Sequence, residues 1–304
     1  MKSTVSNEKY EYSRLNVLIT KLSVWMKELF TSPICINACL HYDKGRVVHR
    51  NWGDDINIFF LEKLWKRSMT PLWMSSRFNR PGKTNYLVIG STIAMLSTRD
   101  TVIYGGGIID DNAPLPDKPG KVLAVRGPLT REYLLRHGVD CPEVYGDPAM
   151  LIPYYYSPTV PKRYKLGIIP HYDDYASPLL DRLKNNPEIL FIKMEGYDTW
   201  TQVIDQIISC EHIASSSLHG LIMAEAYGIP NLWIEVTGQL LGGHFKFHDF
   251  FCSLGIDREQ PFKITPTTTY EGIMSALKSY RKGFIDLKPL VEASPFPIKC
   301  KIIK

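Results

Sequence analysis

The stretch HIASSSLHGLIMAEAYGIPNLWIEV, residues 212–236, contains a strand, a helix and a second strand in succession. HIASSS has the pattern of a buried strand end, LHGLIMAEAYG that of a helix, and NLWIEV that of the next strand. Ser215, Ser216, Ser217 and His219 therefore lie around a helix N-terminus. Such an end offers free N–H groups and a partial positive charge, so this junction favours an anionic ligand.

The same alternation of strand and helix extends along the chain in both directions. Strand-like runs include YLVIGS, TVIYGGG, KVLAVRG and YKLGIIPHY, and helical patterns include NWGDDINIFFLEKLWKR, PLTREYLLRHG and TWTQVIDQIISC. Strands that alternate with helices form parallel sheets covered by helices on both faces. We expect an α/β fold with two Rossmann-like lobes and a cleft between them, lined by the carboxyl ends of the strands.

A proline-rich stretch near the middle of the chain marks the division between the lobes. LIPYYYSPTVPKRYK, residues 151–165, has three prolines and no helical period. We expect a first lobe over residues 1–155 and a second lobe over 156–304, with a last helix near 268–286 that packs back on the first lobe.

Composition narrows the class of protein. The 304 residues carry a net charge of +5 without long basic runs, which argues against nucleic acid and fits a phosphorylated substrate or an anionic membrane surface equally well. The six cysteines form no CxxC pair, so we expect free thiols in a reducing compartment. The polar start and the lack of a membrane-spanning run predict a cytoplasmic protein.

Residues 14–30, RLNVLITKLSVWMKELF, have the spacing of an amphipathic helix. Lys21 and Lys27 could face lipid headgroups, which would make this a membrane-surface helix. A helix packed on the domain explains the same pattern, and we favour that interpretation.

Several other residues are candidates for holding an anion. Gly105, Gly106 and Gly107 end a strand and could point backbone N–H groups at a ligand, although a tight turn explains them equally well. Arg126 ends another strand, and a guanidinium matches carboxylate and phosphate groups. His171 follows a strand and could bind phosphate or relay a proton, or form a bond with Asp173 or Asp174 in its loop.

The remaining candidates have both structural and chemical interpretations. Asn51 or Asp54 could cap a helix, and Asp54 could also accept a proton from a sugar hydroxyl. Asp147 before Pro148 is typical of a turn. GGHFKFHDF, residues 242–250, could be a flexible lid that carries Lys246, or an ordinary surface loop. No group of residues has convincing metal-ligand spacing, so we expect no bound metal.

In their order along the chain, these segments resemble the polysaccharide pyruvyl transferase family. The matching stretches are NWGDDINIFFLEKL, VIYGGGII, AVRGPLTREYLLRHG, YGDPAMLIP, GIIPHYDD and SSSLHGLIMAEAYGIP. The resemblance implies a GT-B-like architecture, with the acceptor side and part of the donor site in the first lobe and the donor site in the second. It also implies transfer of a pyruvyl group from phosphoenolpyruvate, as co-substrate without another cofactor, to two sugar hydroxyls, with release of phosphate.

The resemblance also implies roles for particular residues. His219 and Leu218 match the family's Arg-Leu-His motif, whereas Ser217 stands where the arginine would be. Arg126 corresponds to a first-lobe arginine. Serine hydroxyls, the helix N-terminus, His171 or Lys246 could replace the missing charge. His219 would be the general acid, and Asp54 or Glu225 the base.

The expected acceptor is a glycan of capsule or exopolysaccharide biosynthesis. The family suggests a lipid-diphosphate-linked oligosaccharide at the inner face of the cytoplasmic membrane, and a peripheral association through residues 14–30 would suit it. A nucleotide-sugar glycosyltransferase of the same architecture is the alternative enzyme, and an anion-binding scaffold is the alternative without catalysis.

Overall fold

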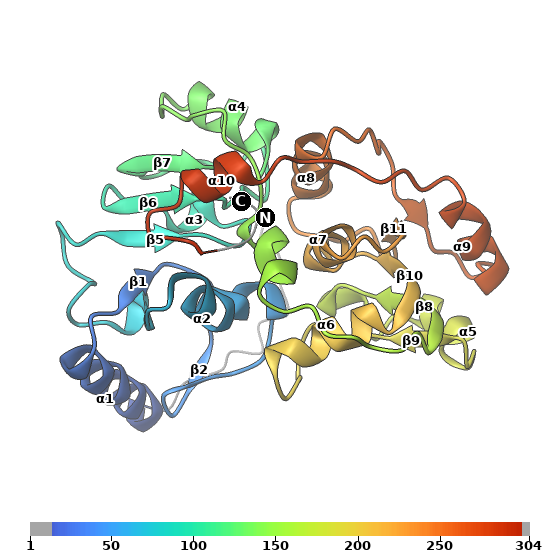
Figure 1. The fold of residues 1–304 in the computed structure, drawn as a ribbon, viewed down its shortest axis with the longest axis horizontal. Helices are drawn as coiled ribbons and strands as arrows, with labels where there is room; N and C mark the ends of the chain where they lie inside the picture. Colours follow the sequence, from blue (N-terminus) through green and yellow to red (C-terminus); the bar gives the residue numbers. More distant parts are fainter. Residues whose placement is uncertain (1–13, 300–304) are drawn as a thin grey trace, which may run out of the picture.

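Two parallel β-sheets flanked by helices make up the computed structural model, which describes residues 14–299 (Figure 1). The strand order is β4-β1-β5-β6-β7 in the first sheet and β12-β11-β10-β8-β9 in the second. Every neighbouring pair of strands in both sheets is parallel. The expected α/β class with two parallel sheets is therefore confirmed. We call the two sheets with their helices the first and second lobes.

Each sheet takes its strands from one part of the sequence. The first contains β1 (Ile34–Ile36), β4 (Met69–Pro71), β5 (Asn85–Leu87), β6 (Thr101–Tyr104) and β7 (Lys121–Ala124). The second contains β8 (Tyr164–Ile169), β9 (Ile189–Phe191), β10 (Cys210–Ser215), β11 (Asn231–Glu235) and β12 (Phe262–Lys263). A separate antiparallel pair is formed by β2 (Tyr42–Asp43) and β3 (Arg46–Val47). The exact division at residue 155 stays a prediction.

Helices connect the strands, as the alternating pattern predicted. They are α1 (Arg14–Phe30), α2 (Trp52–Trp65), α3 (Ile93–Leu96), α4 (Pro128–Arg136), α5 (Asp181–Lys184), α6 (Trp200–Ile208), α7 (Leu218–Ala226), α8 (Phe245–Ser253), α9 (Tyr270–Leu277) and α10 (Lys288–Glu292). Short 3-10 turns occur at η1 (Leu72–Met74), η2 (Pro148–Tyr154), η3 (Tyr172–Asp174) and η4 (Pro178–Leu180).

Two predicted segments have a different structure. The predicted lid at 242–250 largely forms the helix α8, because Phe247, Phe250 and Phe251 share a helical spacing and are all buried. The start of the predicted linker is the 3-10 turn η2, whose residues Met150, Leu151 and Ile152 are buried. The lid prediction is therefore wrong, and the predicted linker begins in η2 and ends in the first two residues of β8, with no helix or strand between them.

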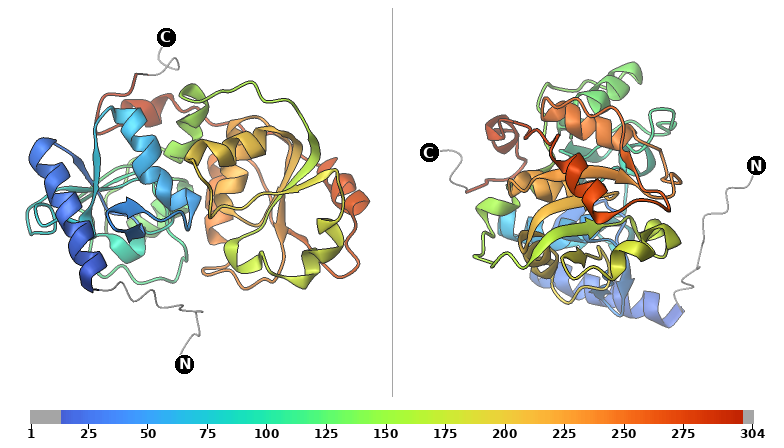
Figure 2. Two further views of the ribbon diagram at one scale, coloured as in Figure 1. Left: turned by 90° about the horizontal axis from the view of Figure 1, so that it is seen from below. Right: turned by 90° about the vertical axis from the view of Figure 1, so that its right-hand side faces the viewer.

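Several contacts join the two lobes. The buried Trp52 indole in α2 donates its Nε1–H to the carbonyl of Trp200 in α6, at 2.7 Å. The C-terminal segment returns to the first lobe, where the Tyr104 hydroxyl donates to the Leu290 carbonyl and Phe296 packs on Trp65. Figure 1 shows this segment crossing from α9 to α10, and Figure 2 shows the two lobes side by side. The lobes are thus held together by buried contacts.

Helix α1 packs on the first lobe, as expected, but Val24 is its one buried apolar residue. Its buried positions are Thr20, Val24 and Glu28. The Thr20 hydroxyl accepts a hydrogen bond from the amide of Gly45, and the Glu28 carboxylate accepts one from the hydroxyl of Thr70. The polar side of α1 therefore faces the protein.

The five cysteines among the described residues form no disulfide. Cys35, Cys141 and Cys210 are buried, and burial raises the pKa of the Cys210 thiol to about 11. Cys252 is exposed, and Cys300 lies outside the described residues. The prediction of free thiols therefore holds for these five residues.

Candidate functional site

The candidate residues follow the carboxyl ends of strands from both sheets. Gly105 follows β6 and Arg126 lies two residues beyond β7, in the first lobe. His171 lies two residues beyond β8 and Ser216 follows β10, in the second lobe. In parallel α/β sheets, ligands bind outside the carboxyl ends of the strands. The fold thus collects these residues where the two lobes meet.

Two helix N-termini converge on the imidazole of His219. This residue lies in the first turn of α7, and Gly53 lies in the first turn of α2. A Cβ atom on Gly53 would lie 2.0 Å from His219 Nδ1, so only glycine allows this approach. Each N-terminus carries a partial positive charge. Their convergence makes a site that favours an anion.

His219 is uncharged in the free protein. Its pKa is lowered to about 3, first by burial and then by the positive charges of Arg126 and Lys246. Its Nε2 is buried and has no hydrogen-bond partner among the described residues. An unpaired buried polar atom is costly, which marks Nε2 as a position where a ligand group would be stabilising.

Arg126 is completely buried and fixed by three hydrogen bonds. Its Nε donates to Asp249 in α8, one terminal nitrogen donates to the hydroxyl of Ser91, and the other to the carbonyl of Ile108. The bond to Asp249 is a buried salt bridge of 2.9 Å. Arg126 therefore forms a structural salt bridge, and its charge still acts on the neighbouring His219 and Lys246.

The glycine run serves packing more than ligand binding. The amide of Gly105 donates to the carbonyl of Ala124, and that of Gly107 donates to the carbonyl of Gly90. A Cβ on Gly107 would lie 2.3 Å from the central guanidinium carbon of Arg126. The prediction that these two amides bind the donor is therefore wrong, because both are already used. The glycines instead leave room for the guanidinium.

Lys246 is the least expected member of the site. Its side chain comes from α8, is only 8% exposed, and has no carboxylate or hydrogen-bond partner among residues 14–299. Burial and then Arg126 lower the pKa of its ammonium to about 8. The charge of Lys246 in turn lowers the pKa values of His171 and His219. An unpaired, mostly buried cation is a strong indication of an anionic ligand.

Ser216 positions the loop that carries His171. The Ser216 hydroxyl accepts a hydrogen bond from the amide of His171 and donates one to Asp174, at 2.8 and 2.9 Å. Because these bonds use the hydroxyl, its predicted contact with the donor is replaced by a structural role. The imidazole of His171 lies 3.2 Å from the carboxylate of Asp173, and burial lowers its pKa to about 4.

Ser217 and Asp54 lie at the two converging N-termini and are both partly exposed. The Ser217 side chain makes no capping bond to α7. Helix α2 is capped by Asn51, whose side chain accepts from the amide of Gly53. Asp54 is therefore not the cap. Burial and the adjacent Asp55 raise its pKa to about 7, so it exchanges a proton near neutral pH.

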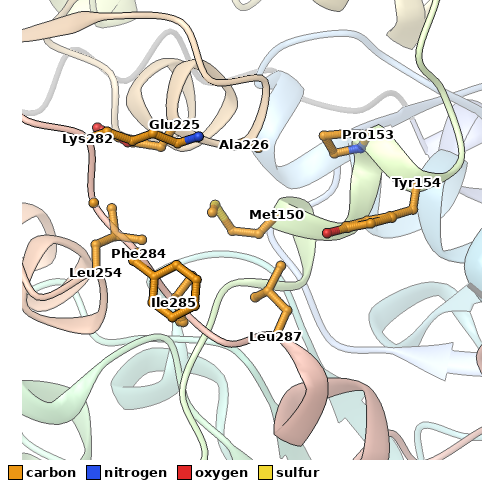
Figure 3. A pocket seen from close by; sticks show the side chains of 11 residues that line it. Met150, Pro153, Tyr154, Glu225, Ala226, Leu254, Lys282, Phe284, Ile285 and Leu287 are labelled. Carbon is orange, nitrogen blue, oxygen red and sulfur yellow. The ribbon is translucent and has the colours of Figure 1, made fainter. Parts of the chain in front are cut away.

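Glu225 lies away from this site, at the other end of α7. Its carboxylate accepts hydrogen bonds from Asn231, Arg258 and Tyr280. It borders a cavity of about 360 Å³ between η2, α7 and the C-terminal segment (Figure 3). The side chains that Figure 3 labels around this cavity include Met150, Leu254 and Leu287, none of them a predicted site residue. The proposed role of Glu225 as a base is thus replaced by a structural one.

Two acids complete the surroundings of Arg126. Asp147 caps η2 by accepting from the amide of Ala149, as its turn position predicted, and burial raises its pKa to about 6. Asp249 also accepts from the amide and the hydroxyl of Thr130. Sequence reasoning missed Asp249 because the segment around it was interpreted as a lid. As a helix, this segment puts Lys246 and Asp249 three residues apart on one face.

The site residues do not form a metal centre. Among residues 14–299, no three His, Cys, Asp or Glu side chains are grouped so that they could hold a metal ion. The charged groups at the site are instead mainly cations and proton-exchanging side chains.

Comparison with known proteins identifies the family. The family model for polysaccharide pyruvyl transferase matches residues 62–238. The chain is 32% identical over 216 residues to uncharacterized protein L143 of Acanthamoeba polyphaga mimivirus, covering 69% of this chain and 73% of that protein. It is 27% identical over 257 residues to succinoglycan biosynthesis protein ExoV of Rhizobium meliloti (strain 1021), covering 80% and 74%.

Among solved structures, the uncharacterized protein KP1_0663 from Klebsiella pneumoniae is similar, with 14% identity and a TM-score of 0.40 over 81% of this chain and 97% of that one. The family model covers more than half of the 304 residues. The chain belongs to the polysaccharide pyruvyl transferase family.

Proposed function

We propose that this protein transfers a pyruvyl group from phosphoenolpyruvate to two hydroxyls of one sugar, forming a cyclic ketal and releasing phosphate. The observation that carries the proposal is the unpaired ammonium of Lys246, which lies with Arg126 and His219 in one electrostatically connected site. A small donor with a phosphate and a carboxylate would supply the missing negative charge.

Lys246 replaces the arginine that the family motif has at the position of Ser217. The ammonium is close enough to His219 for its positive charge to lower the pKa of that imidazole. Arg126 is engaged by Asp249 and acts mainly as a fixed positive charge behind the site. Lys246 and the two helix N-termini then bind the donor anions directly.

His219 becomes the general acid only when the donor is bound. Burial, Arg126 and Lys246 keep it neutral in the free protein. Bound phosphate and carboxylate groups would offset both cations and raise the pKa of the imidazole. The imidazolium then protonates the methylene carbon of the donor, and a sugar hydroxyl attacks the resulting oxocarbenium-like carbon. Proton uptake on donor binding, measured by calorimetry in buffers of different ionisation enthalpy, checks this step.

Asp54 accepts the proton of the attacking hydroxyl. Its pKa of about 7 matches the pKa that a general base needs near neutral pH. The second hydroxyl of the same sugar then closes the ring as phosphate leaves. The two oxygens of the ketal thus come from the acceptor, and the three pyruvyl carbons come from the donor.

The acceptor is a glycan of capsule or exopolysaccharide biosynthesis, carried on a lipid diphosphate. This assignment extends the general role of the family in polysaccharide pyruvyl transfer and the role of ExoV in succinoglycan biosynthesis. It predicts that the enzyme works in the cytoplasm, at the inner face of the membrane.

The test is phosphate release from phosphoenolpyruvate over a panel of glycan acceptors, with the product mass measured. Donor-dependent release with a product heavier than the acceptor by one pyruvyl ketal supports the proposal. Thermal stabilisation by a nucleotide-sugar, with no stabilisation by phosphoenolpyruvate, would instead identify a glycosyltransferase and overturn it. Donor binding without phosphate release over the whole panel would indicate a binding protein.

A further inference from the structure

Helix α1 presents an apolar stripe to solvent. Leu15, Leu18, Leu22, Trp25, Leu29 and Phe30 are between 45% and 80% exposed. All but Phe30 recur every three or four residues, so they lie along one side of the helix. A helix on the surface of a soluble protein normally buries this side, but α1 buries Thr20, Val24 and Glu28 instead. Helix α1 therefore presents its apolar side to solvent and its more polar side to the protein.

The inverted orientation is fixed by polar contacts. Lys27 makes a salt bridge of 2.9 Å with Glu62 of α2, and the Glu28 carboxylate accepts from Thr70. The carbonyl of Glu28 also accepts a hydrogen bond from Arg77. These bonds come from the side of the helix opposite the stripe, so the apolar residues cannot turn inward without breaking them. Figure 2 shows α1 at the outer edge of the first lobe.

Positive charge surrounds the stripe. Residues 14–83 contain twelve Lys or Arg and five Asp or Glu residues, a net charge of +7 against +5 for the whole chain. Exposed Arg14 and Lys21 lie on α1 itself at the edges of the stripe. A surface that is both apolar and basic matches a bilayer with anionic headgroups.

A second copy of the chain fits this surface less well. A helix of 17 residues is about 25 Å long, and a stripe about 10 Å wide covers about 250 Å². A stable protein interface needs about 800 Å² on each partner. Symmetric pairing would also bring the basic residues of two copies together. None of the described helices is long and apolar enough to cross a bilayer, so contact would be along the surface.

We infer that α1 docks the protein on an anionic membrane, with the helix lying parallel to the surface. Leu18, Leu22 and Trp25 enter the boundary between headgroups and acyl chains, while Arg14 and Lys21 contact lipid phosphates. This inference does not depend on the chemistry of pyruvyl transfer, and its test uses neither donor nor acceptor.

The test is flotation of the full-length protein with vesicles of phosphatidylcholine, or of phosphatidylcholine with an equal amount of phosphatidylglycerol. The unmodified protein should bind the anionic vesicles, and more weakly as salt is added. Leu18→Glu with Leu22→Glu should weaken binding at least about a hundredfold, because each buried leucine contributes tenfold or more. Arg14→Glu with Lys21→Glu should remove the preference for phosphatidylglycerol.

Leu135→Glu is the matched control, because Leu135 is also exposed on a helix, α4, away from α1 in Figure 1. This variant should bind vesicles as the unmodified protein does, and circular dichroism should show that all variants are folded. The inference is overturned if the unmodified protein does not float, or if the Leu18/Leu22 variant floats equally well. A dimer in sedimentation that these two substitutions dissociate would also overturn it, in favour of self-association.

Discussion

Replacing Lys246 by methionine should make the free protein more stable and the enzyme much less active. The side chain is nearly buried, its ammonium has no salt bridge or hydrogen bond among residues 14–299, and its pKa falls from 10.5 to about 8. A decrease of this size corresponds to roughly 3 kcal/mol of unfavourable free energy for keeping the group charged in the folded state. Methionine has a similar volume and no charge, so Lys246→Met should recover up to that amount.

The stabilisation should depend on pH. Below pH 8 the ammonium is charged in both the folded and the unfolded protein. The free energies of unfolding of Lys246→Met and the unmodified protein should therefore differ by the full amount. Between pH 8 and 10.5 the folded state loses its proton first, and the difference fades. Urea unfolding of both proteins from pH 7 to 10.5 measures this trend.

Activity should change in the opposite direction. Removing one preorganised charge from an anion site typically costs about 10²–10³-fold in kcat. Phosphate release measures the loss, and the donor should also raise the Tm of Lys246→Met less than that of the unmodified protein. Adding Ser217→Arg, which restores the family motif, should recover part of the activity. Lys278→Met, at an exposed position after α9, should change neither quantity. Lower stability at pH 7 combined with full activity would refute the reasoning.

His219→Ala should lower kcat by about 10²–10⁴-fold with an unchanged circular dichroism spectrum, and unchanged turnover would exclude it as the acid. The value of kcat/KM should increase as the pH rises through 7, because Asp54 must lose its carboxyl proton, with a pKa of about 7, before it can act as a base. Asp54→Asn should remove both the rise and most of the activity, and a variant that keeps the rise would contradict the role of base. Arg126→Met should lower the free energy of unfolding, measured by urea titration, by about 3–5 kcal/mol, because it leaves the charge of Asp249 buried without its partner. Near-normal stability of this variant would argue against the salt bridge.

The sequence predicted the fold well, because the strands and helices of both lobes have strong local patterns. The run at 212–236 forms β10, α7 and β11 as expected. The boundaries were less accurate. The predicted strand YLVIGS, residues 86–91, ends at Leu87. Strand ends depend on pairing between distant segments, which local patterns do not contain.

The site was harder to predict, since its chemistry depends on which groups are paired in space. Arg126 and Lys246 look alike in sequence as cations near a ligand. Only the fold shows that Asp249 neutralises the first, and that the second has no salt bridge or hydrogen bond among the described residues and lies over the ring of Phe247. Similarly, the glycines at 105–107 have a pattern typical of anion loops, but their packing against Arg126 and Pro148 depends on the tertiary structure.

The buried bond between Arg126 and Asp249 also limits how the two lobes can move. It joins Arg126, two residues beyond strand β7 of the first lobe, to helix α8 of the second lobe. Helix α8 also packs against both α4 and α7. Swinging the lobes apart would expose and separate these two charges, at a cost of several kcal/mol. The enzyme should therefore admit its substrates by shifts of loops and side chains, while the two lobes keep their relative positions during catalysis.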